Sequence, residues 1–203
     1  MAKLLLATNN QGKVREYRIL LQALPYELVT LAEQGITTKV SEEGDSMEEN
    51  ARLKATALAG EAQLLALADD SGLEVDALGG EPGILSARYA GEGASDRERV
   101  DYLLSRLKNV PWQQRSSRFR CVIAVATPQG EVELCSGECP GMIVFAPQGE
   151  QGFGYDPVFF LPELGKTMAE LPLEVKNRVS HRAKAAEKVS WALERLGGSE
   201  CAP

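Results

Sequence analysis

The opening of the chain constrains its fold more than any other segment, because strand and helix signals alternate there at short spacing. Lys3–Thr8 is an apolar run of strand length, and Asn9–Gly12 is a polar turn. Apolar side chains then recur at helical spacing over Lys13–Leu24, until Pro25 ends the segment. Tyr26–Thr30 has the composition of a second strand. Strand, helix and strand in this order predict a βαβ-like opening of an α/β fold.

The later segments predict that strands and helices continue around one mixed sheet. Two S-x-x-E capping boxes, Ser46 with Glu49 and Ser95 with Glu98, and the apolar spacing near the C-terminus indicate helices. Short apolar or β-rich runs indicate strands. The predicted helices cover 46–65, 95–107 and 180–196, and the predicted strands cover 67–70, 118–127, 131–136 and 158–161. We therefore predict an α/β fold with a mixed central sheet flanked by helices, in one domain over 1–203 with two lobes and a cleft.

The last predicted helix is expected to be continuous. Ser180 stands where an N-cap would be, and Gly197 and Gly198 follow the last apolar position. One face of this helix is expected to be buried, and it consists of Ala185, Val189, Ala192 and Leu196.

Composition limits the classes of function. The 203 residues are 44% hydrophobic and 25% charged, which is typical of a globular protein with a sizeable core. No stretch reaches the roughly 18 apolar residues of a membrane span, and the apolar run near the N-terminus is too short for a secretion signal. We therefore expect a cytoplasmic protein that binds no membrane. The net charge of −7 argues against nucleic acid as a partner, and an anionic small substrate would need a local basic cluster or a metal.

The cysteines do not predict a disulfide framework or a zinc site. There are four of them, and the two closest are spaced C-x₃-C without a second Cys/His pair. We expect reduced, structural thiols at Cys121, Cys135, Cys139 and Cys201.

The polar segment Thr8-Asn9-Asn10-Gln11-Gly12-Lys13 lies between the first strand and the first helix. Backbone N–H groups at a helix N-terminus, with a lysine in the first turn, can cradle a polyphosphate. The segment is not a Walker A loop, because the first glycine is missing and Val14 replaces Ser or Thr. The alternative is an ordinary strand-to-helix turn with a solvated lysine.

Asp69 and Asp70 end the predicted strand 67–70, and Ser71-Gly72 follows as a tight turn. Paired carboxylates at a strand end suit a hard cation such as Mg²⁺. Because adjacent residues of a strand point to opposite faces, only one of the two carboxylates is expected to face a site. A solvated turn rich in Asp, Ser and Gly is the alternative.

Two segments could bind a base. Phe153, Tyr155 and Asp156 offer aromatic faces and an acceptor in a turn-rich loop, although turn packing also explains them. His181, the only histidine, stands beside Arg182 in the first turn of the last predicted helix. It is either a packed core residue or part of a helix N-terminus that binds an electron-rich group.

Taken together, these segments resemble the inosine triphosphate pyrophosphatase family, and within it the bacterial XTP/dITP diphosphatase branch. The matching pieces occur in the family's order from about Lys3 to Leu196. They are LLLATNNQGKVREY, EENARLKA, ADDSGLEVDALGGEPGILSARYAGE, GFGYDPVFF and KNRVSHRAKA. The resemblance implies an elongated two-lobed fold with a cleft between the lobes, and a homodimer. It also implies hydrolysis of ITP, dITP and XTP to the monophosphate and pyrophosphate.

The resemblance assigns roles to individual positions. Asp70 matches the metal ligand and proton acceptor, and the other matching positions contact the substrate. Those that contact the triphosphate are Thr8, Asn9, Asn10, Gln11, Gly12, Lys13 and Lys54. Ser71 matches a further substrate contact, and the base-recognition positions are Phe153, Gly154, Tyr155, Asp156, Lys176, His181 and Arg182. On this basis Lys13 and Lys54 are electrostatic clamps, and Lys176 or Arg182 donates to the 6-carbonyl of the purine.

The chain departs from the family at the start of its acidic loop, Glu42–Asp45. Many relatives have a metal-binding acid three residues before a glycine, and counting back from Gly44 gives Ser41 here. Two alternatives follow. Either Glu42 serves as the ligand after a small loop adjustment, or Asp70 and the substrate phosphates hold Mg²⁺ mostly with water.

Two other functions remain open. A pyrophosphatase of the related Maf type would prefer dTTP, UTP or modified pyrimidines. A non-catalytic sensor of inosine nucleotides would keep the base loop and the phosphate cradle, and the serine at position 41 favours it, whereas the presence of both Asp70 and Lys13 favours the enzyme. An RNA-binding role agrees least with the acidic charge.

Overall fold

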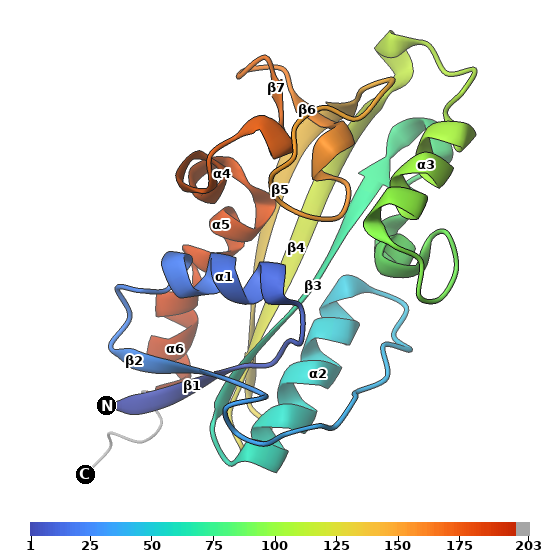
Figure 1. Cartoon of the computed structure of the whole chain (residues 1–203). Coiled ribbons are helices and arrows are strands. Elements are labelled where there is room, and N and C mark those ends of the chain that lie inside the picture. The colour runs from blue at the N-terminus through green and yellow to red at the C-terminus, as the bar shows by residue number, and fades with distance from the viewer. Residues whose placement is uncertain (198–203) are drawn as a thin grey trace. The chain divides into compact units, whose positions relative to one another are not determined.

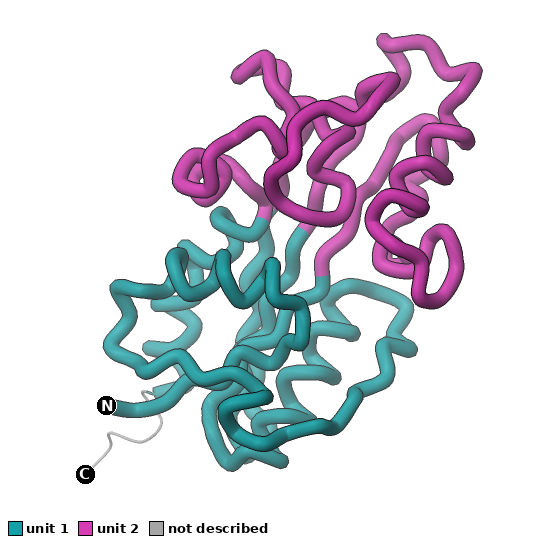
Figure 2. The backbone as a smooth tube through the Cα atoms, in the orientation of Figure 1, with its two compact units in different colours: residues 1–70, 121–137, 182–203 teal, residues 71–120, 138–181 magenta. Residues whose placement is uncertain are grey.

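The computed structural model describes residues 1–197, so Gly198 and Cys201 lie outside the described residues. The chain forms two compact units, coloured separately in Figure 2. Unit 1 contains residues 1–70, 121–137 and the chain from 182 onward, and unit 2 contains residues 71–120 and 138–181. The expected single domain with a cleft between two lobes stays a prediction, and each unit is described by itself below.

The strands and helices follow one another as labelled in Figure 1. The strands are β1 (Ala2–Leu6), β2 (Tyr26–Thr30), β3 (Leu65–Val75), β4 (Ser116–Ala126), β5 (Val132–Ile143), β6 (Phe159–Leu161) and β7 (Lys166–Thr167). The α-helices are α1 (Gln11–Leu20), α2 (Met47–Ala62), α3 (Asp96–Arg106), α4 (Leu173–Val179), α5 (His181–Ala186) and α6 (Val189–Gly197). Short 3₁₀ helices lie at Asp76–Leu78, Gly83–Arg88, Trp112–Gln114, Asp156–Val158 and Met168–Glu170.

The strands form one sheet in the order β2-β1-β3-β4-β5-β6-β7. β1 pairs in parallel with both β2 and β3, whereas β6 pairs antiparallel with β5 and with β7. β4 and β5 are neighbours joined by only five residues, as a hairpin requires. The predicted mixed α/β sheet and its βαβ opening are therefore confirmed.

The first helix begins earlier than predicted because of a cap. Asn10 is the N-cap of α1, and its side chain accepts a hydrogen bond from the backbone N–H of Lys13 at 3.1 Å. Helical geometry therefore starts at Gln11, inside the segment predicted as a turn. The helix ends at Leu20, four residues short of the predicted end.

The second helix begins where its capping residue predicts. Ser46 accepts a hydrogen bond from the backbone N–H of Glu49, but the Glu49 side chain accepts from the N–H of Asp45, so only half of the predicted capping box forms. Gln63 adopts a left-handed conformation and ends α2 before Leu65. The capping box predicted at Ser95 and Glu98 is confirmed in full at the start of α3.

The prediction that the third strand ends at its two carboxylates is wrong. β3 continues through the expected Ser-Gly turn to Val75, and Leu73 and Val75 are both buried. The N–H of Leu73 donates to the hydroxyl of Ser86 at 2.9 Å, which satisfies the backbone beyond the expected end. The local turn residues are overridden by this packing, and Asp69 and Asp70 lie inside a strand.

The prediction of one continuous C-terminal helix is also wrong. Ser180 is the C-cap of α4, a helix that the sequence reading missed, and residues 187–188 separate α5 from α6. The four residues expected on one buried face, Ala185, Val189, Ala192 and Leu196, are all buried in the core of unit 1. The apolar spacing therefore identified the buried face but not the break between α5 and α6.

Each unit has its own apolar core. Leu4, Leu6, Leu67 and Ile123 contribute to the core of unit 1, and Leu73, Leu103 and Phe159 to that of unit 2. Cys121, Cys135 and Cys139 are buried free thiols. Within the described part of the chain, none of the helices has the length and apolar character needed to cross a membrane.

The burial of Leu67 in the core of unit 1 predicts how its substitution changes the free energy of unfolding. Leu67→Ala removes a side chain that is only 1% exposed and leaves a cavity, so the free energy of unfolding should fall by about 2–5 kcal/mol. The same substitution at Leu53, which is 42% exposed in the same unit, should change it by less than about 0.5 kcal/mol. Urea unfolding measures both, and equal losses would contradict the assignment of Leu67 to the core.

Candidate functional site

The polar loop before α1 leads into a helix whose Lys13 contacts Asp69 on β3. The hydroxyl of Thr8 accepts the N–H of Asn10 at 3.2 Å, and the Asn10 cap then directs the chain into the helix. Lys13 Nζ lies 2.9 Å from Asp69 Oδ2, and the lysine side chain keeps 14% of its surface exposed. Asn9, Asn10 and Gln11 are exposed. The loop predicted to cradle phosphate therefore ends in a cation that an anion can still reach.

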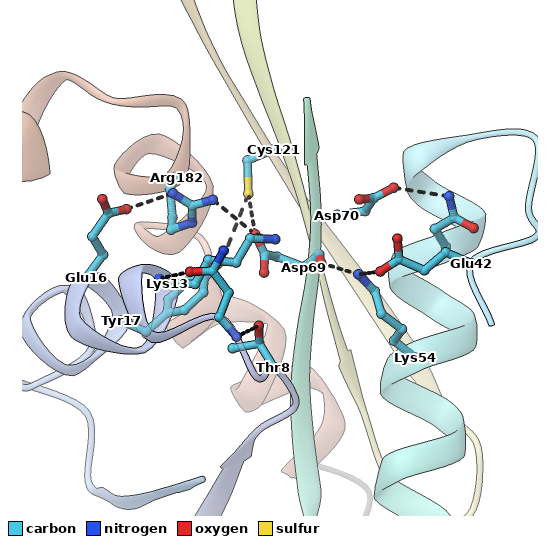
Figure 3. Close-up of polar contacts among 12 residues, drawn as sticks. Thr8, Lys13, Glu16, Tyr17, Glu42, Lys54, Asp69, Asp70, Cys121 and Arg182 are labelled. Atoms are coloured by element: carbon cyan, nitrogen blue, oxygen red, sulfur yellow. Dashed lines mark hydrogen bonds and ion pairs between the residues drawn. The ribbon is translucent and has the colours of Figure 1, made fainter. Parts of the chain in front are cut away.

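Asp69 is a buried anion with two cationic partners. Its Oδ2 accepts from Lys13 at 2.9 Å and from Arg182 Nη2 at 3.3 Å, and Cys121 Sγ lies at 3.8 Å (Figure 3). Burial raises the pKa of a carboxyl, but the charges of Lys13, Arg182 and Lys54 outweigh it and hold the pKa of Asp69 well below its usual range. Asp69 is therefore a fixed negative charge.

Asp70 points to the other face of β3, as the period of a strand requires (Figure 3). Its Oδ2 accepts from Asn50 Nδ2 at 3.1 Å, and the residue is 7% exposed. Burial raises its pKa, and the positive charges of Lys54 and Lys13 only partly offset this effect. Two adjacent aspartates thus have pKa values displaced in opposite directions.

Lys54 connects the two carboxylate positions with the acidic loop. Its Nζ donates to the backbone carbonyl of Asp69 at 2.6 Å and to Glu42 Oε1 at 2.8 Å. Burial lowers the pKa of a lysine, but the charges of Asp69, Glu42 and Asp70 outweigh this and raise the pKa of Lys54. Lys54 is therefore a permanent cation between Glu42 and β3.

The residues at the start of the acidic loop have different partners. Ser41, which occupies the position of the expected acid, donates its hydroxyl to Glu43 at 2.7 Å. Glu42 pairs with Lys54, and its charge raises the pKa of Asp70, so it lies within electrostatic reach of that carboxyl. Glu42, rather than Ser41, is therefore the charged residue of this loop beside Lys54 and Asp70.

Three residues that the sequence reading did not assign to the site belong to these contacts. Asn50 holds both Asp70 and the backbone N–H of Gly44, which it accepts at 2.9 Å. Asp69 pairs with Lys13, and Glu16 pairs with Arg182 at 2.7 Å. A charged residue at a buried helix position was the available signal for Glu16, three residues after Lys13 on α1.

In unit 2 the predicted base loop is held by Asp156. Its Oδ2 accepts from the N–H of Phe153 at 2.9 Å and from Lys176 Nζ at 2.5 Å. Lys176 is buried, and its Nζ lies 4.8 Å from the centre of the Phe153 ring. A Cβ on Gly152, where φ is +79°, would lie 2.0 Å from Asp156 Oδ2, so the loop requires glycine there.

The rest of the loop is anchored by its backbone and by one hydroxyl. The N–H of Gly154 donates to Asp96 at 2.6 Å, and the Tyr155 hydroxyl donates to the carbonyl of Ser86 at 2.9 Å. Tyr155 is buried, which agrees with packing of the turn, whereas Phe153 is partly exposed. Phe153, Asp156 and Lys176 therefore form the polar and aromatic group of unit 2.

The predicted residues at the unit boundaries have different surroundings. His181 is buried and its ring stacks on Phe119, with centroids 4.7 Å apart and an interplanar angle of 19°. The side chain of Arg182, the next residue, pairs with Glu16 and Asp69 in unit 1. Ser71 is partly buried on β3, immediately after Asp70. Lys13, Lys54, Asp70 and Arg182 are thus brought around β3 in unit 1.

Comparison with known proteins shows the family of this chain. The model of the Ham1 family matches residues 4–191. The chain belongs to the Ham1 family. This confirms the family resemblance that the sequence motifs carried.

The relatives match over nearly their whole length. A protein of Desulforamulus reducens named dITP/XTP pyrophosphatase is 50% identical, covering 96% of each chain. One of the same name from Geobacter sulfurreducens is 51% identical, covering 91% of this chain and 93% of the relative. The solved structure of the Staphylococcus aureus Ham1 protein has a TM-score of 0.84 and 42% identity, covering 96% of this chain and 99% of that one.

Asn50 provides a test of how the acidic loop of this Ham1 protein is held. Asn50→Ala leaves the Gly44 N–H and one oxygen of Asp70 without their buried partner. The free energy of unfolding should fall by about 1–3 kcal/mol. Hydrogen exchange at the Gly44 amide should accelerate as well, because its acceptor is lost.

Asn109→Ala, an exposed asparagine, is the matched control and should change neither quantity. Unchanged exchange at Gly44 in Asn50→Ala would show that Asn50 does not hold the loop.

Proposed function

We propose that this Ham1 protein hydrolyses the deaminated purine nucleotides ITP, dITP and XTP to the monophosphate and pyrophosphate. The names of the relatives from Desulforamulus reducens and Geobacter sulfurreducens support this proposal. The observation that carries it is the meeting of Lys13 and Lys54 at Asp69, next to the buried carboxyl of Asp70. Two cations beside a potential proton acceptor suit the cleavage of a phosphoric anhydride.

The triphosphate is bound by cations and by backbone donors of unit 1. At the start of α1, which also supplies Lys13, the N–H groups of Gln11 and Gly12 have no acceptor within the helix and attract anions, whereas that of Lys13 is bound by the Asn10 side chain. Lys54 is kept charged by its acidic neighbours. These groups supply the local positive charge that a chain with a net charge of −7 needs for an anionic substrate.

Asp70 and Glu42 fit a Mg²⁺ ion. Both are hard oxygen donors on the Lys54 side of β3, and the charge of one raises the pKa of the other. Among the described residues, no three His, Cys, Asp or Glu side chains are grouped closely enough to form a full ligand set. A site with two carboxylates, completed by phosphate oxygens and water, is typical of Mg²⁺. When bound, the ion neutralises phosphate charge.

Asp70 accepts the proton of the attacking water. The water oxygen forms a bond to the α-phosphorus, the bond between the α-phosphorus and its bridging oxygen to the β-phosphate breaks, and the electron pair leaves with pyrophosphate. Burial raises the pKa of Asp70 and makes it a stronger base than an ordinary carboxylate. Lys13 and Lys54 neutralise the charge that grows on the leaving group.

The base is recognised by the group in unit 2, in which Phe153 provides a stacking face and Lys176 a donor. Hypoxanthine and xanthine present a carbonyl at position 6, which accepts from Lys176, whereas adenine presents an amino group there. One of the three Lys176 donors is bound to Asp156, which fixes the ammonium beside Phe153. The remaining base-recognition positions that the family resemblance implies are Gly154, Tyr155, Asp156, His181 and Arg182.

We also propose an oligomeric state and a cellular location for the protein. The family resemblance implies a homodimer, and the composition indicates a cytoplasmic protein that binds neither nucleic acid nor membranes.

A substrate panel separates the proposal from a Maf-type enzyme and from a silent sensor. Pyrophosphate release should be at least tenfold faster, by kcat/KM, from ITP and XTP than from ATP, GTP, dTTP and UTP. It should stop when EDTA removes the divalent metal. A preference for dTTP or UTP would favour the Maf-type reading, and binding of ITP without any release would favour the sensor.

Asp70→Asn should bind ITP as the wild type does but lose about 10²–10⁴-fold in kcat, because it lacks a proton acceptor. The matched control is Asp101→Asn, which replaces an exposed aspartate on α3. Single-turnover kinetics and a parallel binding measurement separate an effect on turnover from an effect on ITP binding. Near-normal turnover by Asp70→Asn would remove Asp70 from the chemistry.

Lys176→Ala should narrow the ratio of kcat/KM for ITP over ATP by roughly 5- to 150-fold, the value of a buried polar contact of about 1–3 kcal/mol. Lys166→Ala replaces an exposed lysine of the same unit and should leave the ratio unchanged. An unchanged ratio in Lys176→Ala would place selectivity elsewhere.

A further inference from the structure

The base loop of unit 2, residues 152–156, is held at one backbone amide by a carboxylate from a distant helix. The N–H of Gly154 donates to Asp96 Oδ2 at 2.6 Å. The carbonyl of the same peptide group, that of Phe153, accepts the N–H of Asp156 at 3.3 Å. Because both polar groups of this peptide are bound, its plane is fixed. The Phe153 side chain directly precedes the peptide, so the fixed plane limits where its ring can lie.

Asp96 is available for this contact because other residues cap its helix. Ser95 is the N-cap of α3, and Ser95 and Glu98 exchange both hydrogen bonds of a complete capping box. Asp96, the first residue of the helix, instead places one carboxylate oxygen on the Gly154 amide and the other on Arg99 Nη2. The start of α3 would therefore be capped without Asp96, and its carboxylate serves the base loop.

Arg99 connects Asp96 with a further segment of unit 2. Its Nη1 donates to the backbone carbonyl of Ala87 at 2.8 Å and to that of Ala94 at 2.7 Å. Ala87 belongs to the 3₁₀ helix Gly83–Arg88, and Ala94 immediately precedes the N-cap of α3. The Arg99 side chain is 18% exposed and that of Asp96 is 45% exposed, so the arginine is the more buried partner. Arg99 keeps two carbonyl acceptors if Asp96 is replaced, and such a variant should still fold.

These contacts close a ring that begins and ends at the base loop. The hydroxyl of Tyr155 donates to the carbonyl of Ser86 at 2.9 Å, and the next carbonyl of that 3₁₀ helix accepts from Arg99. The ring therefore passes in order through Tyr155, Ser86, Arg99, Asp96 and Gly154, all of them in unit 2. Two adjacent residues of the base loop are thus tied to one ion pair, whose charges strengthen the hydrogen bonds that they make.

We propose that Asp96 and Arg99 are positioning residues for base recognition, which hold the Gly154 amide so that Phe153 and Lys176 can bind the purine together. This inference rests on the proposed function, because it takes the group in unit 2 as the place where the base binds. The two residues act through the loop and not on the substrate itself. Their effect should therefore appear with ligands that carry a base and be absent with a ligand that consists of phosphates alone.

Ligands with and without a base separate this role from a general effect on the fold. IMP carries the base and has no phosphoric anhydride to hydrolyse, AMP is its amino counterpart, and inorganic tripolyphosphate has no base. Calorimetry with Mg²⁺ measures the three affinities for Asp96→Ala, Asp96→Asn and Arg99→Ala. The matched control is Asp101→Ala, which breaks an exposed ion pair with Arg97 on the same helix. Hydrogen exchange at the Gly154 amide and thermal unfolding are measured for every variant.

Asp96→Ala should weaken IMP binding by about tenfold, the value of one hydrogen bond to a charged group, and should lower the ratio of IMP to AMP affinity. Exchange at the Gly154 amide should accelerate, and the affinity for tripolyphosphate should not change. Asp96→Asn keeps an oxygen acceptor for the amide, so it should lose less than Asp96→Ala. Arg99→Ala should weaken IMP binding in the same direction, and Asp101→Ala should match the wild type in every readout.

Equal losses of IMP and tripolyphosphate affinity would overturn the proposal, because they would reflect general damage to the fold. Wild-type IMP affinity in Asp96→Ala would also overturn it, since the amide would then need no anchor for the base to bind. If the wild type releases no pyrophosphate from ITP but its IMP binding depends on Asp96, the proposed function fails and the positioning role stands. If it releases pyrophosphate and IMP binding does not depend on Asp96, the positioning role fails and the proposed function stands.

Discussion

The alternation of side chains along β3 is the constraint on which the candidate site depends. Because neighbouring residues of a strand face opposite sides, Asp69 meets Lys13 and Arg182 while Asp70 meets Asn50. One carboxyl is held ionised by its cations, and the other is made a stronger base by burial. The predicted strand 67–70 contains both residues and already separates the two carboxylates. The extension of β3 to Val75 places both aspartates inside the strand, and two identical side chains have different surroundings there.

Much of the candidate site could be predicted from the local sequence, but the distant residues that pair with its charged side chains could not. The family motifs indicated Lys13, Lys54 and Asp70, and the period of a strand indicated that only one carboxylate would face a site. The counter-charge of Asp69 is Arg182, which is 113 residues away in the chain, and no local pattern reports such a contact. Glu16 was missed for the same reason, since its buried position becomes meaningful only when Arg182 is beside it.

The secondary structure likewise has parts that the local sequence predicted and parts that it did not. Apolar spacing predicted β2 at its observed bounds, the cap at Ser46 and the buried face of the last helices, because each depends on near neighbours. It missed the break at residues 187–188 and the continuation of β3, where contacts with distant segments outweigh local preference. At the start of α5, His181 stacks on Phe119 and the next residue, Arg182, pairs with Asp69, and neither contact has a local signal in the sequence.

The central claim is that Asp69 is a fixed charge and Asp70 a base, and a carboxyl titration tests it most directly. Carbon-13 NMR of the metal-free protein, with the two signals assigned from Asp69→Asn and Asp70→Asn, follows both groups in one sample. The account predicts that the pKa of Asp70 lies above the ordinary value of an aspartate and that the pKa of Asp69 lies well below it. Coincident midpoints, or a higher midpoint for Asp69, would contradict it.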